Sequence, residues 1–274
     1  MTDSSPLVVS KQSDAYWRAT FDNPPLNLVD PETVLALREL MDALEADPTV
    51  KVVVFDSADE DFFIAHFDIA RGGELPLEPG PTGLPIWSDL AARLTRAPFV
   101  TIAEIRGRAR GLGSEFALAC DLRFASREKA VFGQPEVGLG LVPGGGSIEV
   151  LSALAGRSRA LEIILSGDDF DADTAERYGW INRALPDAEL SPFVDRLARR
   201  IAGFERPALV RAKAQINKRA GTPSDEDLLE ARTVFSESGT WPGTQRRVRE
   251  ALAQGLQQRG DFELNQGARL GPAD

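Results

Sequence analysis

Residues 98–146 of the chain read PFVTIAEIRGRARGLGSEFALACDLRFASREKAVFGQPEVGLGLVPGGG. Glu115 opens an apolar helical run after a glycine-rich turn, and Glu136 precedes a second glycine-rich segment. Carboxylates in such weakly charged surroundings suit general acid/base chemistry, because burial raises a carboxyl pKa and lets one group donate a proton while the other accepts. The alternative is structural: Glu115 is then a first-turn helix residue favoured by the helix dipole, and Glu136 a loop residue.

The glycine-rich turn Gly107–Ser114 has a second chemical use. A helix that begins there presents unpaired backbone N–H groups and the positive end of its dipole, which together stabilise a developing oxyanion. Leu112 or Gly113 is placed to supply such an N–H, and the segment Phe62–Ile69 is a source of another. The alternative is a tight turn that needs glycine only for its backbone geometry.

The flanking segments predict an α/β fold. Tyr16–Phe21 and Val50–Ser57 are expected strands, and the helix between them begins at Asp30-Pro31-Glu32 with an N-cap and a proline in the first turn. A strand, helix and strand in this order favour a parallel pair, with a sheet covered on both faces. We expect further strands at 99–104, 122–125 and 130–132, and helices at about 86–96, 147–156, 157–165, 171–178, 189–203, 206–220, 224–238 and 242–257. An exposed loop is expected at 72–85 and a frayed end at 265–274.

Composition narrows the class of protein. The 274 residues are 43% hydrophobic and 27% charged, which is typical of a globular protein, and the net charge of −11 argues against a nucleic-acid binder. One cysteine, Cys120, and one histidine, His66, exclude an intramolecular disulfide and a Cys/His zinc site. Because we find neither a signal peptide nor a membrane-length apolar stretch, we expect a cytoplasmic protein without membrane association.

Three common functional motifs are disfavoured because residues that they require are missing. Gly111-Leu112-Gly113 starts like a dinucleotide fingerprint, but Phe116 stands at the third glycine position. The run Gly144–Ser147 lacks the lysine of a P-loop. A Ser-His-Asp hydrolase is disfavoured because no nucleophile elbow surrounds Ser114, and an isolated His66 is more often structural than catalytic.

Taken together, these segments resemble the crotonase superfamily, the enoyl-CoA hydratases and isomerases. The matching pieces are Pro98–Ala103, Gly111–Glu115, Ala119–Asp121, Phe132–Glu136, Val142–Gly146 and the earlier Ala65–Ile69, and a weaker similarity extends from Tyr16 to Gln258. The resemblance implies a spiral of ββα/βαβ turns over residues 1–200, which carries an acyl-CoA site. It also implies a C-terminal helical region for trimerisation over residues 201–274, with a homotrimer or dimer of trimers as the assembly.

The resemblance also implies roles for individual residues. The backbone N–H groups of Phe67 and Leu112 would form an oxyanion hole for a coenzyme A thioester. Glu115 and Glu136 would hold and activate one water and deliver a proton. Gly144 and Ala65 would contact water or substrate.

Coenzyme A itself would contact Asp68, Ile69 and Arg71. Arg106, Arg108 and Arg110 are equally well read as CoA contacts or as solvated arginines beside the turn. No metal and no cofactor is implied, since coenzyme A enters as part of the substrate.

Both glutamates together favour reversible hydration of a trans-2-enoyl-CoA, a step of fatty acid metabolism among other pathways. The alternatives are double-bond isomerisation, another crotonase-type reaction, or an acyl-CoA-binding protein with little turnover. His66 and Leu112 stand where glycine is usual in this family, which predicts backbone strain at His66 and a narrowed space above the thioester. The segment Trp241–Arg246 also lacks the acidic-glycine pattern that many members carry.

Overall fold

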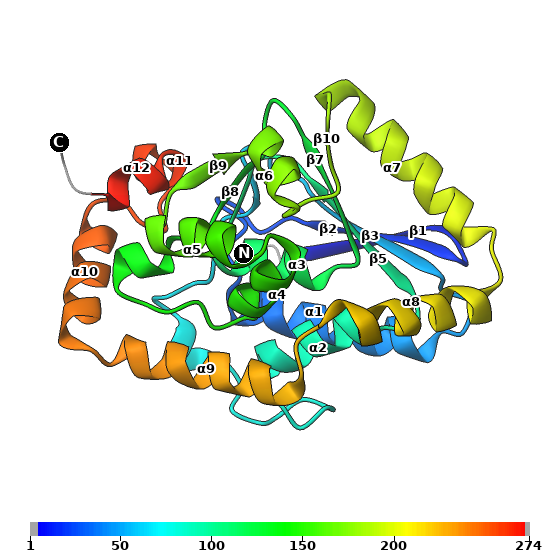
Figure 1. Ribbon diagram of the computed structural model, residues 1–274, viewed down its shortest axis with the longest axis horizontal. Helices are drawn as coiled ribbons and strands as arrows, with labels where there is room; N and C mark the ends of the chain where they lie inside the picture. The colour runs from blue at the N-terminus through cyan, green and yellow to red at the C-terminus, as the bar shows by residue number, and fades with distance from the viewer. Residues whose placement is uncertain (1–4, 272–274) are drawn as a thin grey trace.

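Two sheets form the centre of the molecule in the computed structural model, which describes residues 5–271 (Figure 1). The larger sheet has the strand order β1-β2-β3-β5-β7-β10 and the smaller one β4-β6-β8-β9. The strands are β1 Leu7–Ser13, β2 Tyr16–Phe21, β3 Val52–Ser57, β4 Phe62–Ile64, β5 Val100–Ile105, β6 Arg108–Arg110, β7 Leu122–Ser126, β8 Val131–Gly133, β9 Asp169–Asp171 and β10 Arg183–Leu185.

Helices surround the sheets and make up most of the chain after residue 146 (Figure 1). They are α1 Pro31–Ala46, α2 Ile86–Arg96, α3 Leu112–Ala119, α4 Ser147–Leu154, α5 Arg157–Ser166, α6 Ala172–Tyr178, α7 Asp187–Ala202, α8 Arg206–Ala220, α9 Asp225–Gly239, α10 Pro242–Ala253, α11 Asp261–Leu264 and α12 Gln266–Leu270, with short 3₁₀ turns η1 Gly72–Glu74 and η2 Pro135–Leu139. No helix within residues 5–271 is long and apolar enough to cross a membrane.

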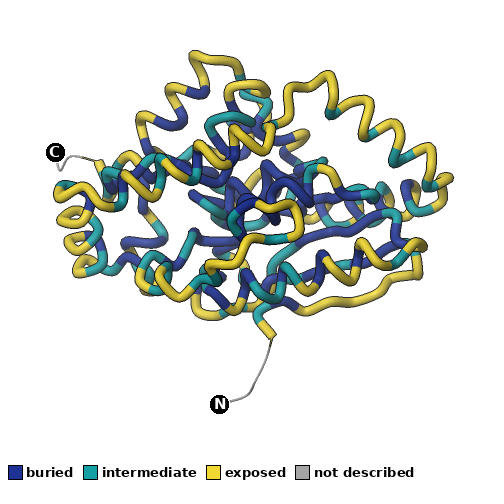
Figure 2. Tube along the Cα trace, turned by 90° about the horizontal axis from the view of Figure 1, so that it is seen from below, coloured by how far each residue is buried: buried dark blue, intermediate teal, exposed yellow. Residues whose placement is uncertain are grey.

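The parallel βαβ arrangement is confirmed. β2, β3, β5, β7 and β10 pair in parallel, and β1 adds an antiparallel edge. Along β3, Val53 packs with α1 and α2 on one face, whereas Val52 and Val54 pack with α7 on the other. The continuous apolar run of β3 follows from this burial on both faces. Figure 2 shows the result as a buried centre within exposed peripheral helices.

The N-terminus of α1 forms as its sequence predicts. The Asp30 side chain accepts a hydrogen bond from the Thr33 N–H, and Pro31 occupies the first turn. Proline fits there because its missing N–H would have no partner within the helix.

The structure departs from the sequence-based expectations at both ends of the chain. Strand β1 has no predicted counterpart: after Leu7 all its residues are exposed, Val8 and Val9 included, and backbone pairing with β2 holds it. The frayed end expected from Asn265 is wrong up to Gly271, since α12 packs on η2 and Gln266 is buried. Residues 272–274 lie outside the described part.

The smaller sheet positions the candidate site. β4, β6 and β8 are parallel, so their carboxyl ends meet at one edge. The chain leaves β4 into His66 and Phe67, β6 into Gly111 and α3, and β8 into η2 with Glu136. Three segments far apart in sequence thereby reach the same place.

Candidate active site

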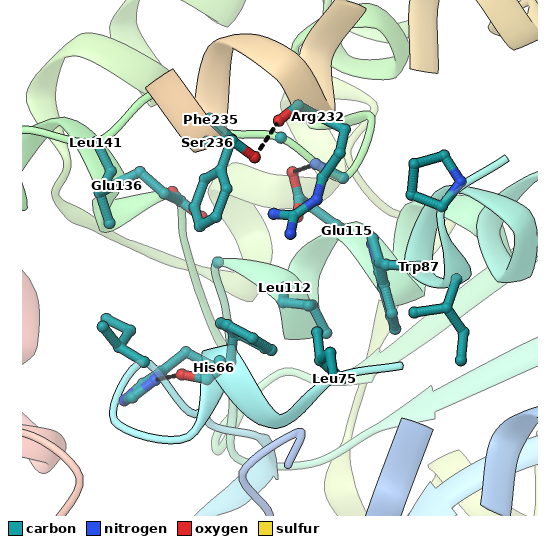
Figure 3. Close-up of a pocket in the computed structure, with 18 of the residues that line it drawn as sticks. His66, Leu75, Trp87, Leu112, Glu115, Glu136, Leu141, Arg232, Phe235 and Ser236 are labelled. Carbon is teal, nitrogen blue, oxygen red and sulfur yellow. Dashed lines mark hydrogen bonds between the residues drawn. The ribbon is translucent and has the colours of Figure 1, made fainter. Parts of the chain in front are cut away.

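A cavity of about 500 Å³ lies where these three segments meet (Figure 3). Glu115 and Glu136 both line it, together with apolar side chains. The apolar lining comes from Phe67, Ile69, Leu75, Leu77, Ile86, Trp87, Leu112, Leu139, Leu141, Leu229 and Phe235. The structure therefore brings the two predicted carboxylates into one mostly apolar chamber.

Pairing with Val29 fixes the orientation of the Phe67 N–H. The Val29 N–H donates to the His66 carbonyl at 2.9 Å, and the Asp68 N–H donates to the Val29 carbonyl at 3.0 Å. Phe67 is the bridge partner between these bonds. Its own N–H therefore points to the opposite side of the segment, where Phe67 lines the cavity.

The two residues on either side of Leu112 are glycines because neighbouring atoms lie too close to their Cα atoms for a side chain to fit. Gly111 has φ +49°, and a Cβ there would lie 2.9 Å from Glu136 Oε1. A Cβ on Gly113 would lie well under 3.0 Å from the Ile64 carbonyl oxygen of β4. Leu112 begins α3, so its N–H has no partner within the helix. Its half-buried side chain lines the cavity on the same side as Leu75 (Figure 3).

The two glutamates have unlike surroundings. Glu115 Oε1 accepts hydrogen bonds from the Gly145 N–H at 2.8 Å and the Ser147 hydroxyl at 2.9 Å. Glu136 is buried and has fewer donors among residues 5–271: the Gln134 amide 3.5 Å away and its own backbone N–H. Burial raises the pKa of Glu115, and these hydrogen bonds oppose the rise. Burial and then the charge of Glu115 raise the pKa of Glu136 to about 8. One proton between them at neutral pH therefore resides on Glu136.

The remaining predicted contacts are divided between the cavity and its supports. Gly144 lines the cavity, and a Cβ there would collide with Phe235. Ile69 also lines it. Asp68 accepts from the Gln257 side chain at 2.7 Å and the Arg71 N–H at 3.1 Å. Ala65 does not line the cavity: it packs with Leu26 and Phe62, and its N–H donates to the Asn27 carbonyl.

The arginines have protein partners. Exposed Arg71 pairs with Glu32 and Glu74. Arg106 pairs with Glu104 and Asp187, Arg108 donates to the Leu264 carbonyl, and buried Arg110 pairs with Asp169. Buried Arg110 is a structural link, so the interpretation as a solvated side chain is wrong there. Arg106 and Arg108 are half-buried and also bind protein groups, and none of the three arginines lines the cavity.

The backbone strain expected at His66 is absent. Within residues 5–271 only Asn27 and Gln257 among non-glycine residues have positive φ. The His66 ring is buried, with Nδ1 2.8 Å from the Phe67 carbonyl oxygen and Nε2 2.9 Å from Glu263 Oε1. Burial of the His66 ring lowers its pKa, but the Glu263 carboxylate and the Phe67 carbonyl together outweigh burial and raise the pKa of His66. Sequence reasoning missed Glu263 because nothing local links it to a residue 197 positions away.

Arg232 was also missed. It lies on α9 and lines the cavity close to Glu115 (Figure 3). An arginine on an amphipathic helix has no sequence signal that separates an inward from an outward position. Across the described part of the chain, no three His, Cys, Asp or Glu side chains are grouped to hold a metal ion.

Comparison with known proteins places this geometry in a family. The family model described as enoyl-CoA hydratase/isomerase matches residues 12–254. A crotonyl-CoA hydratase of Syntrophomonas wolfei is 33% identical over 207 residues, 74% of this chain and 78% of the relative. A short-chain-enoyl-CoA hydratase of Clostridium acetobutylicum is 32% identical over 212 residues, 77% of this chain and 81% of the relative.

Solved structures agree with the sequence comparison. A crystal structure from Streptomyces avermitilis, with enoyl-CoA hydratase as its provisional assignment, is 46% identical with a TM-score of 0.93, covering 100% of this chain and 99% of that one. An enoyl-CoA hydratase from Mycobacterium avium subsp. paratuberculosis is 26% identical with a TM-score of 0.80, covering 91% and 100%. The fold is thus the crotonase-like α/β spiral that the sequence predicts, and the chain belongs to the enoyl-CoA hydratase/isomerase family.

Proposed function

We propose that the protein is an enoyl-CoA hydratase that adds water reversibly across the 2,3 double bond of a trans-2-enoyl-CoA. The observation that carries the proposal is the pair of buried glutamates with unlike surroundings in one cavity. Hydration needs one ionised and one protonated group at the same time, and a lone binding function needs neither.

The thioester carbonyl is bound first. Its oxygen accepts hydrogen bonds from the Phe67 and Leu112 N–H groups, with the positive end of the α3 dipole behind Leu112. These donors stabilise the negative charge that develops on the oxygen as the double bond is attacked. Loss of one donor of this type costs about 3–4 kcal/mol of barrier.

Proton transfer then follows the charge states of the glutamates. Ionised Glu115 takes a proton from a water held near the Gly144 N–H, and the water oxygen bonds to the β-carbon. The π-electron pair moves toward the thioester oxygen and returns to form a C–H bond at the α-carbon with the proton of Glu136. A second transfer, from Glu115 back to Glu136, restores the pair.

Coenzyme A and assembly complete the proposal. His66, Phe67 and Ile69 of the segment Ala65–Arg71 line the cavity, and we assign this segment to the coenzyme. Ala65, Asp68 and Ile69 would contact it, and Arg71 would leave Glu32 and Glu74 to bind a phosphate of the substrate. The division at residue 200, a homotrimer or dimer of trimers, a cytoplasmic location and a place in fatty acid metabolism rest on family resemblance.

The decisive experiment mixes purified protein with crotonyl-CoA and a medium-chain trans-2-enoyl-CoA. We expect loss of the conjugated thioester absorbance with a 3-hydroxyacyl-CoA product. Conversion to a 3-enoyl-CoA would replace hydration by isomerisation. Saturable binding without either product would leave an acyl-CoA-binding protein.

A further inference from the structure

Arg232 lines the mostly apolar cavity without an anionic partner in contact among residues 5–271; its guanidinium lies 5.2 Å from the centre of the Phe235 ring, a cation–π contact. Its guanidinium makes no ion pair and donates no hydrogen bond to any residue from 5 to 271, in contrast to the fully paired Arg71 and Arg110. Burial lowers the pKa of Arg232 only from a value far above neutrality, so it stays charged. Figure 3 shows the guanidinium pointing from α9 toward Glu115 and Leu112, across the cavity from His66.

Trp87 supplies a second unused donor at the same end. The residue is only 6% exposed, and its indole Nε1 has no hydrogen-bond partner among residues 5–271. Nε1 and Glu115 Oε2 both lie within 3.0 Å of the point where a Cβ on Gly145 would stand, so the indole N–H adjoins the catalytic carboxyl.

The nearby hydroxyl groups cannot serve as donors. Thr233 Oγ1 donates to the Leu229 carbonyl at 2.7 Å, and Ser236 Oγ donates to the Arg232 carbonyl at 2.9 Å. Among the described side chains at this end of the cavity, the donors without a hydrogen-bond acceptor are therefore the Arg232 guanidinium and the Trp87 indole N–H. Both require an acceptor, and a desolvated arginine is stabilised best by a carboxylate in a bidentate pair.

We infer that the acyl chain handled by this protein ends in a carboxylate, which pairs with Arg232. The inference rests on the proposed function, because it names the substrate class of the same site. A methyl-terminated chain would fill the space among Leu75, Leu77 and Phe235 and bury the guanidinium with no carboxylate in direct contact, because Glu115 interacts with it only at a distance. Such burial of an unpaired charge is unfavourable.

Arg232 has one competing role. It lies close enough to Glu115 for their charges to interact, although the two do not form an ion pair. If that is its purpose, Arg232 keeps Glu115 ionised and selects no substrate. The two roles differ in what removal of the charge changes: discrimination between acyl chains in one case, the pH profile of turnover in the other.

Binding of unreactive saturated thioesters tests the inference without turnover. Titration calorimetry compares glutaryl-CoA with pentanoyl-CoA and adipoyl-CoA with hexanoyl-CoA, pairs that differ only in the terminal group. We expect the carboxylate-ended member of at least one pair to bind the wild type about tenfold more tightly. Arg232→Met should abolish this ratio and Arg232→Lys should retain part of it. Arg196→Met, at an exposed position of α7, which contributes no residue to the cavity lining, should leave the ratio unchanged.

The outcomes separate the two proposals. Equal binding within both pairs, or a ratio that survives in Arg232→Met, overturns the carboxylate assignment. The assignment is also overturned if Arg232→Met shifts the acidic limb of the pH–turnover profile but does not change the binding ratio between carboxylate-ended and methyl-ended thioesters. A preserved binding ratio with no hydration of any enoyl-CoA would overturn the hydratase proposal alone, while the carboxylate assignment would stand.

Discussion

At the scale of single residues, the difference between Glu115 and Glu136 leads to a prediction about pH. Turnover requires Glu115 ionised and Glu136 protonated. The hydration rate should therefore fall as pH rises through the Glu136 pKa of about 8. Glu115→Gln removes the neighbouring charge and should move the alkaline limb of the residual rate to lower pH. Either Gln variant should lose about 10²–10⁴-fold in kcat. The exposed Glu39→Gln on α1 serves as control; an unshifted limb in Glu115→Gln contradicts the coupling.

Glu136 should also limit stability. Its folded-state pKa is raised, so its favourable contribution is present at acidic pH and is lost as pH rises from its unfolded value toward about 8. Denaturant unfolding of Glu136→Gln should therefore show a weaker loss of stability over this pH range than the wild type. Parallel pH dependence in the two proteins would show that the carboxyl is solvated.

His66 is expected to be indispensable, although glycine is usual at this position in the family. Its ring links the Phe67 carbonyl to Glu263, so His66→Gly leaves a buried carboxylate without its partner. We expect a loss of about 3–5 kcal/mol of unfolding free energy and a lower rate of hydration. The double variant His66→Gly/Glu263→Gln should lose less than the two single losses added together. Since the pKa of His66 is raised in the folded state, the stability that the His66–Glu263 pair contributes should be lost as pH rises through that raised pKa.

At the scale of elements, the contact between α3 and β4 sets the position of the Leu112 N–H. Gly113→Ala would push α3 away from the Ile64 carbonyl, and we expect at least about 2 kcal/mol of destabilisation with a lower kcat/KM. Gly243→Ala on α10 meets nothing within 4 Å and is the matched control. It should be neutral or stabilise slightly. Equal effects of the two substitutions would refute the role of the α3–β4 contact.

Sequence predicted the elements that carry their own local signal. The apolar run of β3, the cap at Asp30 and the glycine turn before α3 each act within a few residues, and each was confirmed. Strand β1 and helix α12 lack such a signal, since one depends on backbone pairing and the other on packing against η2. The same division holds at the site: Glu115 and Glu136 were found through their flanking motifs, whereas Glu263 and Arg232 reach the cavity region only through tertiary contacts.

At the scale of the whole molecule, the C-terminal residues 257–271 supply hydrogen-bond partners to buried side chains of the sheet region. Besides the bond to His66, Arg110 donates to the Glu263 carbonyl at 2.5 Å, and the Gly267 N–H donates to Asp169 at 3.3 Å. A chain ending at residue 256 would lose the Glu263 carboxylate that binds His66 and the Glu263 and Leu264 carbonyls that accept from Arg110, which would keep only Asp169. We expect its melting temperature to fall by more than that of Glu263→Gln, because packing of α12 on η2 is lost as well.

Activity should be lost in parallel, since η2 carries Glu136 and the α11 contact holds the segment that presents the Phe67 N–H. Calorimetric melting and crotonyl-CoA hydration of the shortened chain measure both effects. A shortened chain that melts like the wild type but has lost activity would mean that α11 and α12 position the site without stabilising the fold. A shortened chain that keeps both would show that β4, β6 and β8 alone hold the three segments of the cavity in place.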